Sequence, residues 1–446
     1  MTEMTMQQIE ELFENKDFAS LKRIMEDEEA ADVAAVMQEL SDEEAFLLFR
    51  IIPKDLAAQT FVEMDSELQC TFIGKFSDHE ITEMLDEMFV DDTVDLIEEM
   101  PANVVKRILA NSSPETRSQI NQILKYPKDS AGSIMTTEFV ELRAHTTVEE
   151  AFERIRATGV DKETIYTCYV TDDSRKLIGV VTVKDMFLGG DNDVEISDLM
   201  ETSIISADTH MDKEEVVKLL DKYDFLALPV VDTENRLVGI ITFDDAMDVM
   251  REEDTEDMEI MAAITPSEKP YLRTGVFETF LSRAPWLLLL MVSAALTSNI
   301  LLHYENALTV VLSAYIPMLM GTGGNAGSQS SVTIIRGLSL GDIEMRNIIT
   351  VIWKEIRVAV LCGLSLAIVN FGKMMLFDGV GLLVAAAVSV TLVLTVLIAK
   401  TVGCSLPIIV KRLGLDPAVM ASPLITTIVD CISLLVYVNA AGLMLS

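Results

Sequence analysis

The sequence predicts a multidomain membrane protein: an all-α, solenoid-like N-terminal domain, two tandem α/β domains, a long connecting helix and a five-helix α transmembrane domain. Three observations lead to this fold class. A net charge of −37 coexists with a hydrophobic content of 50%. Only eight of the 71 acidic residues, but ten of the 34 basic ones, follow residue 270, so acidity and hydrophobicity belong to different halves. The acidic half contains a repeated motif, and the other half contains five apolar segments.

Residues 1–128 are expected to form the helical domain. Apolar residues such as Leu12, Leu21 and Ile24 recur at helical spacing. The tetrapeptides SDEE at 41–44 and SDHE at 77–80 match the S-x-x-E capping box that opens a helix. The N-terminal sequence MTEMTMQQIEELF is acidic and amphipathic and does not match a signal peptide, which places this half in the cytosol.

Residues 129–250 contain a tandem repeat, with units at about 129–190 and 191–250. The segment GVVTVKD at 179–185 recurs as GIITFDD at 239–245, and a β-rich run and a helical pattern precede each copy. This arrangement resembles a pair of CBS domains, a family of regulatory sensors. The resemblance implies that ATP or another adenine nucleotide binds near Thr182, Asp185 and Thr242. Capping of the helix that follows is the alternative role for these side chains.

Residues 251–270 are expected to hold an acidic connecting helix and a linker to the membrane. The helical pattern begins at about residue 244, and many of its acids stand three or four residues apart. Like charges at this spacing destabilise a helix, and bridging divalent cations relieve that repulsion. The alternative is a solvated surface that the charge keeps soluble. In either case such an acidic half does not favour nucleic acid as a partner.

Residues 271–446 are expected to cross the bilayer five times, near 285–302, 307–335, 358–377, 380–402 and 418–445. With the N-terminus in the cytosol, Lys373 is the basic residue that falls on the outer side. This asymmetry predicts a multi-pass protein of the cytoplasmic membrane whose C-terminus lies outside.

Asp430 stands in the middle of the last apolar segment. A carboxylate at the centre of a spanning helix costs about 2.5–3.5 kcal/mol, so we expect it to face the interior of the bundle. Ser422, Thr426 and Asp430 recur every fourth residue and therefore share a helix face. These hard oxygen ligands suit Mg²⁺ and other divalent cations. The alternative is a structural Asp paired with a basic or polar group of another helix.

The second apolar segment contains PMLMGTGGNAGSQSS at 317–331, which predicts a break in the helix. Non-helical backbone at membrane depth occurs where it lines a cavity or is buried in protein. We therefore expect pore-lining residues here, namely Pro317, Gly321, Gly323, Gly324, Asn325 and Gln329. Close packing of small residues between helices is the alternative.

The segments PMLMGTGGNAGSQSSVTIIRGL (317–338) and LGLDPAVMASPLITTIVDCIS (413–433) resemble the signature of the MgtE-type magnesium channel family. The resemblance implies a homodimer whose central pore holds hydrated Mg²⁺ at Asp430. It also implies regulatory Mg²⁺ sites in the cytosolic half and the connecting helix, which close the channel when cytosolic Mg²⁺ is high. The matching acids are Asp91, Asp95, Asp212, Glu214, Asp224, Asp245, Asp248, Glu253, Glu256 and Asp257.

Two other functions fit parts of this pattern. One is an ion-coupled secondary transporter of divalent cations, because broken helices are common in that class. The other is a Mg²⁺-sensing membrane receptor that conducts no ions. Enzyme activity is not expected, because the four histidines form no nucleophile or metal constellation and no G-x-S-x-G or H-E-x-x-H motif occurs.

Overall fold

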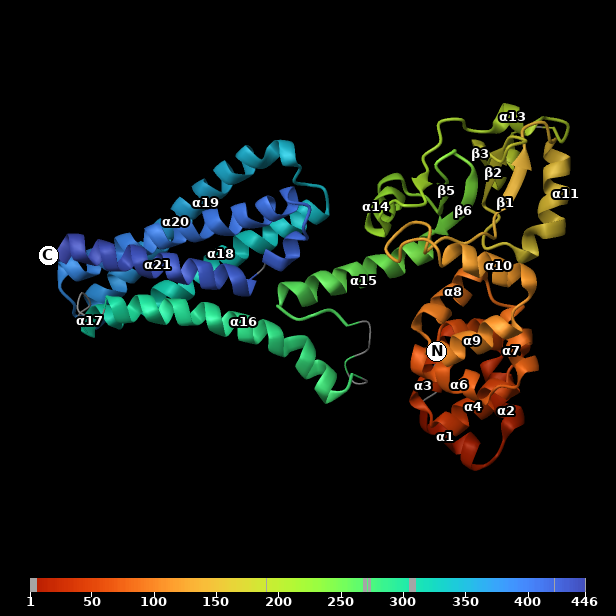
Figure 1. Ribbon diagram of the computed structural model, residues 1–446, viewed down its shortest axis with the longest axis horizontal. Helices are drawn as coiled ribbons and strands as arrows, with labels where there is room; N and C mark the ends of the chain where they lie inside the picture. The colour runs from red at the N-terminus through yellow and green to blue at the C-terminus, as the bar shows by residue number, and fades with distance from the viewer. Residues whose placement is uncertain are drawn as a thin grey trace. The chain divides into compact units, whose positions relative to one another are not determined.

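The computed structural model describes residues 6–189, 191–267, 271, 274–304, 310–420 and 422–445. The chain forms two compact units, residues 1–250 and residues 251–446 (Figure 1).

The first unit begins with ten short helices. They are α1 (Met6–Glu14), α2 (Phe18–Met25), α3 (Ala30–Glu39), α4 (Asp42–Ile51), α5 (Lys54–Val62), α6 (Ser66–Lys75), α7 (Asp78–Leu85), α8 (Val90–Glu99), α9 (Ala102–Asn111) and α10 (Pro114–Ile123). Both predicted capping boxes are confirmed: Ser41 caps α4 with Glu44, and Ser77 caps α7 with Glu80. Apolar side chains of one face of each helix form a common core, in which Phe61 and Phe72 are fully buried. The predicted helical domain is therefore present.

Two similar α/β motifs follow, as the repeat predicts. The first contains β1 (Val140–Arg143), α11 (Val148–Thr158), β2 (Thr167–Thr171), β3 (Leu177–Thr182) and α12 (Val183–Leu188). After the short helix α13 (Ile196–Leu199), the second contains β4 (Ala207–Asp208), α14 (Lys213–Tyr223), β5 (Ala227–Val231), β6 (Leu237–Thr242) and α15 (Phe243–Met261). In each three-stranded sheet the first two strands are parallel and the last two are antiparallel.

The glycine of each repeat accommodates the other motif. A Cβ atom on Gly179 would collide with the Met200 side chain, and one on Gly239 would lie 2.6 Å from Met135 Sδ. Met135 precedes the first sheet and Met200 precedes the second, so each methionine packs on the glycine of the other motif. This reciprocal contact joins the two motifs into one module.

The second unit consists mainly of long helices. They are α16 (Val276–His303), α17 (Val310–Ser313), α18 (Ile316–Ser339), α19 (Ile348–Lys373), α20 (Leu382–Arg412) and α21 (Ser422–Leu445). Four segments of the described chain are long and apolar enough to cross a membrane: Val276–His303, Met345–Asp378, Leu382–Arg412 and Pro417–Leu443. The less apolar α18 packs against α20 and α21. The count of five spans therefore stays a prediction that depends on α18.

The predicted break at residues 317–331 is wrong; the second apolar segment is interrupted earlier, at residues 314–315, between α17 and α18. Helix α18 runs without interruption through the whole glycine-rich stretch. The glycines permit close helix contacts: a Cβ on Gly323 would lie 2.8 Å from Thr395 Cγ2, and one on Gly403 of α20 would collide with the carbonyl of Gly327. Since the helix satisfies its own backbone groups, no cavity is needed to solvate them.

Replacing Gly403 with Ala should destabilise the membrane unit by about 1–3 kcal/mol, because the obstacle is a backbone carbonyl that cannot rotate away. Gly372→Ala on α19 is the matched control, because a Cβ there has no atom within 4 Å and alanine favours the helix. The unfolding midpoint of the detergent-solubilised protein measures both. Equal midpoints for the two variants would contradict the close approach of α18 and α20.

Candidate ion pathway and regulatory metal sites

The predicted pore-lining residues divide between two faces of α18. Gly323 and Gly324 are buried against other helices. Four exposed residues follow one another at intervals of four: Pro317, Gly321, Asn325 and Gln329. Residues at this spacing lie above one another along a helix. We call Pro317, Gly321, Asn325 and Gln329 the polar row.

Asp430 lies on α21, the helix that packs beside α18. The Thr426 side chain, one turn before Asp430, contacts α18 at Gly324. The side chain of Ser422 lies outside the described residues. Within the described part of the chain, the buried Oδ1 of Asp430 has no hydrogen-bond partner. The structural alternative, an Asp paired with a basic or polar group of another helix, therefore finds no support at this oxygen.

Two buried hydroxyls beside α18 escaped the sequence analysis. Thr395 on α20 and Ser433 on α21 both lie next to Gly323, and neither hydroxyl has a hydrogen-bond partner among the described residues. Buried polar groups normally have partners, so unpaired ones indicate water or an ion nearby. Serine and threonine occur often in spanning helices, so the sequence alone does not single these two out.

The second half of α15 contacts α18 and the short helical turn at Pro417–Met420 that precedes α21. Asp254 Oδ1 lies 3.1 Å from Arg336 Nη1 on α18. Ile260 and Met261 pack against Ile335 of α18 and against Ala418. The connecting helix thus meets the ends of both helices that carry the candidate pore residues.

Five carboxylates gather in the first unit where α8 and α15 begin. They are Asp91, Asp92, Glu138, Glu163 and Asp245, which we call the acidic cluster. The Val90 amide donates to Glu138 Oε2 at 3.2 Å, and the Glu163 amide donates to the carbonyl of Glu138. These bonds hold segments from distant parts of the sequence together.

Burial and mutual repulsion raise the pKa values of this cluster. Burial, with the nearby Asp245 charge, raises the pKa of Asp92 to about 6 and that of Glu163 to about 8. Burial also raises the pKa of Asp245 to about 6 and moves that of Asp91 well above its usual range. Asp91 Oδ1 and Glu163 Oε2 are buried and have no hydrogen-bond partner among the described residues. The positive charge of Lys162 acts on Glu138, whereas the acids around Asp91 and Asp245 repel one another.

A hydrated divalent cation fits this cluster better than a bare one. Among the described residues, no three acidic, histidine or cysteine side chains converge closely enough to hold a metal directly. Mg²⁺ retains several of its waters in proteins, and carboxylates can bind those waters. Sequence analysis found Asp91 and Asp245 but missed Asp92, Glu138 and Glu163. Asp92 adjoins Asp91 in the same acidic helix start, whereas Glu138 and Glu163 lie in connecting segments without a motif.

Among the other predicted regulatory acids, Asp248 adds its charge to that of Asp245 in this cluster. Asp212 caps α14 by accepting the Glu214 amide at 2.9 Å, and Glu214 pairs with Lys218 at 2.7 Å. Asp224 ends α14 in a left-handed conformation with φ of 53°. Asp95 on α8 is exposed. The remaining acids follow α15 toward its end: Asp248, Glu253, Glu256 and Asp257.

The predicted nucleotide residues serve as helix caps. Thr182 Oγ1 accepts the Asp185 amide at 3.0 Å and caps α12. Thr242 Oγ1 donates to Asp245 Oδ2 at 2.5 Å at the start of α15. The capping role is therefore present, and it leaves nucleotide binding as a prediction.

Comparison with known proteins gives one consistent result along the chain. The sequence pattern of the MgtE divalent cation transporter matches residues 316–440, that of the MgtE intracellular N domain matches 28–129, and CBS domains match 131–188 and 196–252. The magnesium transporter MgtE of Thermus thermophilus is 36% identical over 443 residues, 98% of each chain. That of Bacillus subtilis is 33% identical over 436 residues, 96% of this chain and 93% of the relative.

A solved structure resembles the first half. It is the cytosolic domain of the Mg²⁺ channel MgtE in complex with ATP, with 32% identity and a TM-score of 0.52, covering 55% of this chain and all of that one. Inosine-5′-monophosphate dehydrogenases also match, but the similarity to that of Nitrosopumilus maritimus covers only 29% of this chain, at 29% identity. Such a length corresponds to the CBS pair.

From the raised pKa values of the acidic cluster we expect the free energy of unfolding of the metal-free protein to fall as the pH rises. Where the pKa of an acid is raised by folding, the unfolded state loses that proton at a lower pH than the folded state does. The free energy of unfolding is therefore highest below about pH 4 and decreases as the pH rises to about 8. Residues 1–264 in EDTA should therefore unfold at a lower temperature at pH 8 than at pH 5. Added Mg²⁺ should raise the unfolding temperature more at pH 8. Asp91→Asn should reduce both effects, whereas Glu39→Gln at an exposed site should leave them unchanged.

Proposed function

The chain belongs to the MgtE family of divalent cation transporters, and from this premise we propose that it is a Mg²⁺-selective channel that closes when cytosolic Mg²⁺ is high. Its full-length relatives are magnesium transporters and not enzymes. The observation that carries the proposal is Asp430, a half-buried carboxylate on an apolar helix whose buried oxygen has no partner in the described structure. A permeating cation is the partner that it lacks.

A homodimer explains the polar row of α18. Asn325 and Gln329 are exposed on one chain, and amide side chains are costly against lipid. A second copy that covers this face would enclose a water-filled path between the two subunits. The proposed path runs along Pro317, Gly321, Asn325 and Gln329 and passes Asp430 and Thr426. Gly323 and Gly324 take part by allowing α20 and α21 to approach.

Mg²⁺ would be recognised with its water shell in this path. Two Asp430 carboxylates, one from each subunit, and the hydroxyl of Thr426 accept hydrogen bonds from bound water. Mg²⁺ loses water reluctantly, so a ring of oxygen acceptors around the hydrated ion is favoured over a dry cage. Mn²⁺, Co²⁺ and Ni²⁺ also accept oxygen ligands and are candidate competitors.

The acidic cluster and α15 supply the proposed feedback. Cytosolic Mg²⁺ would neutralise Asp91, Asp92, Glu138, Glu163 and Asp245 and so favour the state in which α8 and α15 stay together. The end of α15 contacts α18 through Asp254 and Arg336, which supports its role as the gate. The other acids of α14 and α15 are proposed to bind further regulatory ions.

Three further properties belong to this proposal. The protein lies in the cytoplasmic membrane with residues 1–270 in the cytosol and the C-terminus outside. The CBS pair binds ATP or another adenine nucleotide near Thr182, Asp185 and Thr242, as the ATP complex of the similar cytosolic domain suggests. Five helices, including α18, cross the bilayer.

Replacing Asp430 with Asn should abolish Mg²⁺ current, because the neutral amide cannot balance the charge of the ion. The measurement is single-channel recording in inside-out patches with Mg²⁺ as the permeant ion. Asp342→Asn, at an exposed site between α18 and α19, is the matched control and should conduct normally. Mg²⁺ accumulation in liposomes without channel openings would favour a coupled carrier. Mg²⁺-dependent conformational change without flux would favour a receptor.

Replacing Arg336 with Gln should make closure require more cytosolic Mg²⁺. The Asp254–Arg336 pair is partly exposed and contributes at most about 1 kcal/mol, so we expect up to about a fivefold increase in the half-inhibitory concentration. Arg346→Gln is the control, because Arg346 pairs with Glu344 in the segment that precedes α19. An inhibition curve unchanged by Arg336→Gln would exclude this contact from the gate.

A further inference from the structure

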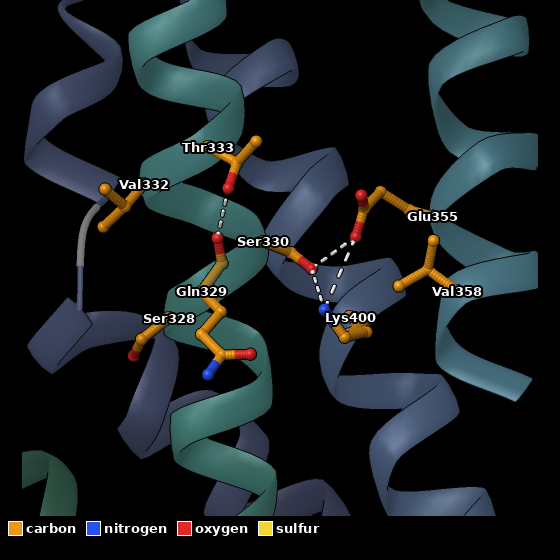
Figure 2. Close-up of a pocket in the computed structure, with 8 residues that line it drawn as sticks. All are labelled: Ser328, Gln329, Ser330, Val332, Thr333, Glu355, Val358 and Lys400. Carbon is orange, nitrogen blue, oxygen red and sulfur yellow. Dashed lines mark hydrogen bonds and ion pairs between the residues drawn. The ribbon is translucent and has the colours of Figure 1, made fainter. Parts of the chain in front are cut away.

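A buried ion pair joins three helices of the membrane unit. Lys400 of α20 is 5% exposed, and its Nζ lies 3.7 Å from Glu355 Oε2 of α19. Ser330 of α18 stands between the two: its hydroxyl donates to Glu355 Oε2 at 2.6 Å and accepts from Lys400 Nζ at 3.2 Å. Figure 2 shows these three side chains pointing toward one another. We call them the Lys400 clamp.

The clamp lies next to a close contact between α18 and α20. Gly403 follows Lys400 by three residues, Gly327 precedes Ser330 by three, and these two glycines bring α20 and α18 together. Residues three apart share a helix face. Two adjacent contacts, one by backbone and one by charge, therefore fix the register and the rotation of α18 against α20.

The clamp also forms part of the wall of a cavity beside the polar row. The cavity has a volume of about 680 Å³ and is lined by Ser328, Gln329, Ser330, Val332, Thr333, Glu355, Val358 and Lys400 (Figure 2). Six waters occupy about 180 Å³ at the density of the liquid, so the cavity has room for a hydrated ion and more water. Gln329 belongs to both the cavity and the polar row. An unbalanced charge in this wall would therefore act on ions in the proposed path.

We propose that Lys400 and Glu355 are positioning residues of the ion pathway. They hold α18 so that Gln329 faces the cavity, and each cancels the charge of the other. The wall thereby stays neutral, and Asp430 supplies the fixed negative charge that attracts the cation. This inference rests on the proposed transport function and adds two residues to it.

Opposite single substitutions test the proposal. Mg²⁺ uptake into liposomes by the full-length protein gives a KM and a maximal rate for each variant. Lys400→Met leaves a lone carboxylate that attracts cations, so KM should fall about fivefold or more. Glu355→Gln leaves a lone ammonium group that repels them, so KM should rise by a similar factor. In both variants the maximal rate should fall, because α18 is no longer held.

The double variant K400M/E355Q separates charge balance from folding. Neutral replacement of both members of a buried pair is usually tolerated, so the protein should be monodisperse and its KM should lie within about twofold of the wild type. Its maximal rate should still fall, because α18 is no longer held. Lys354→Met is the matched control: it removes the same charge from the exposed residue beside Glu355 and should leave KM unchanged.

The results distinguish this inference from the transport function. If both single variants shift KM in the same direction, or if the double variant differs from the wild type by tenfold, the clamp does not balance charge and the inference is wrong. If only one single variant folds, the inference is tested by that variant and the double variant: it is supported when the single variant shifts KM in its expected direction and the double variant stays within about twofold of the wild type. Absence of uptake by the wild type would overturn the transport function, and the inference with it.

Discussion

The bilayer interior offers no water to a charged group, and this constraint organises the membrane unit. Two carboxylates of its helices meet the constraint in opposite ways. Glu355 has a hydrogen bond from Ser330 and an ion pair with Lys400, so its charge is balanced by the protein. Asp430 has a buried oxygen without a partner in the described structure. Balanced charge fixes the helices, and unbalanced charge is available to a cation. The proposed functions of the two residues follow from this difference.

Helix α18 shows how far sequence reasoning reaches. We expected a break in its glycine-rich stretch, but the helix is continuous there because the same glycines also suit close helix packing. A glycine in the sequence does not reveal which neighbour approaches it. The polar row follows from the period of the helix once its continuity is known. The Lys400 clamp could not be predicted, because its three residues come from three helices and form no local motif.

In the first unit, local signals predicted the fold well and the acidic cluster poorly. The capping boxes and the repeat GVVTVKD and GIITFDD act within a few residues, and the structure confirms the helices and strands that they predict. Asp91 and Asp245 were found because they lie at matching positions of a known family. Glu138 and Glu163 join them only through the folding of the chain. Burial raises the pKa of Glu138, and burial together with the charges of neighbouring acids raises that of Glu163.

The free energy needed to close the gate can be compared with what each contact contributes. Changing a gate from 1% to 99% closed requires about 5.5 kcal/mol of difference in ligand binding between the two states. The partly exposed Asp254–Arg336 pair contributes at most about 1 kcal/mol of this. Buried carboxylates that repel one another store more, because an ion that neutralises them removes both the repulsion and the cost of burial. In the proposed mechanism the acidic cluster therefore supplies most of the energy for closure, and the contact between α15 and α18 determines which part of the pore the gate blocks.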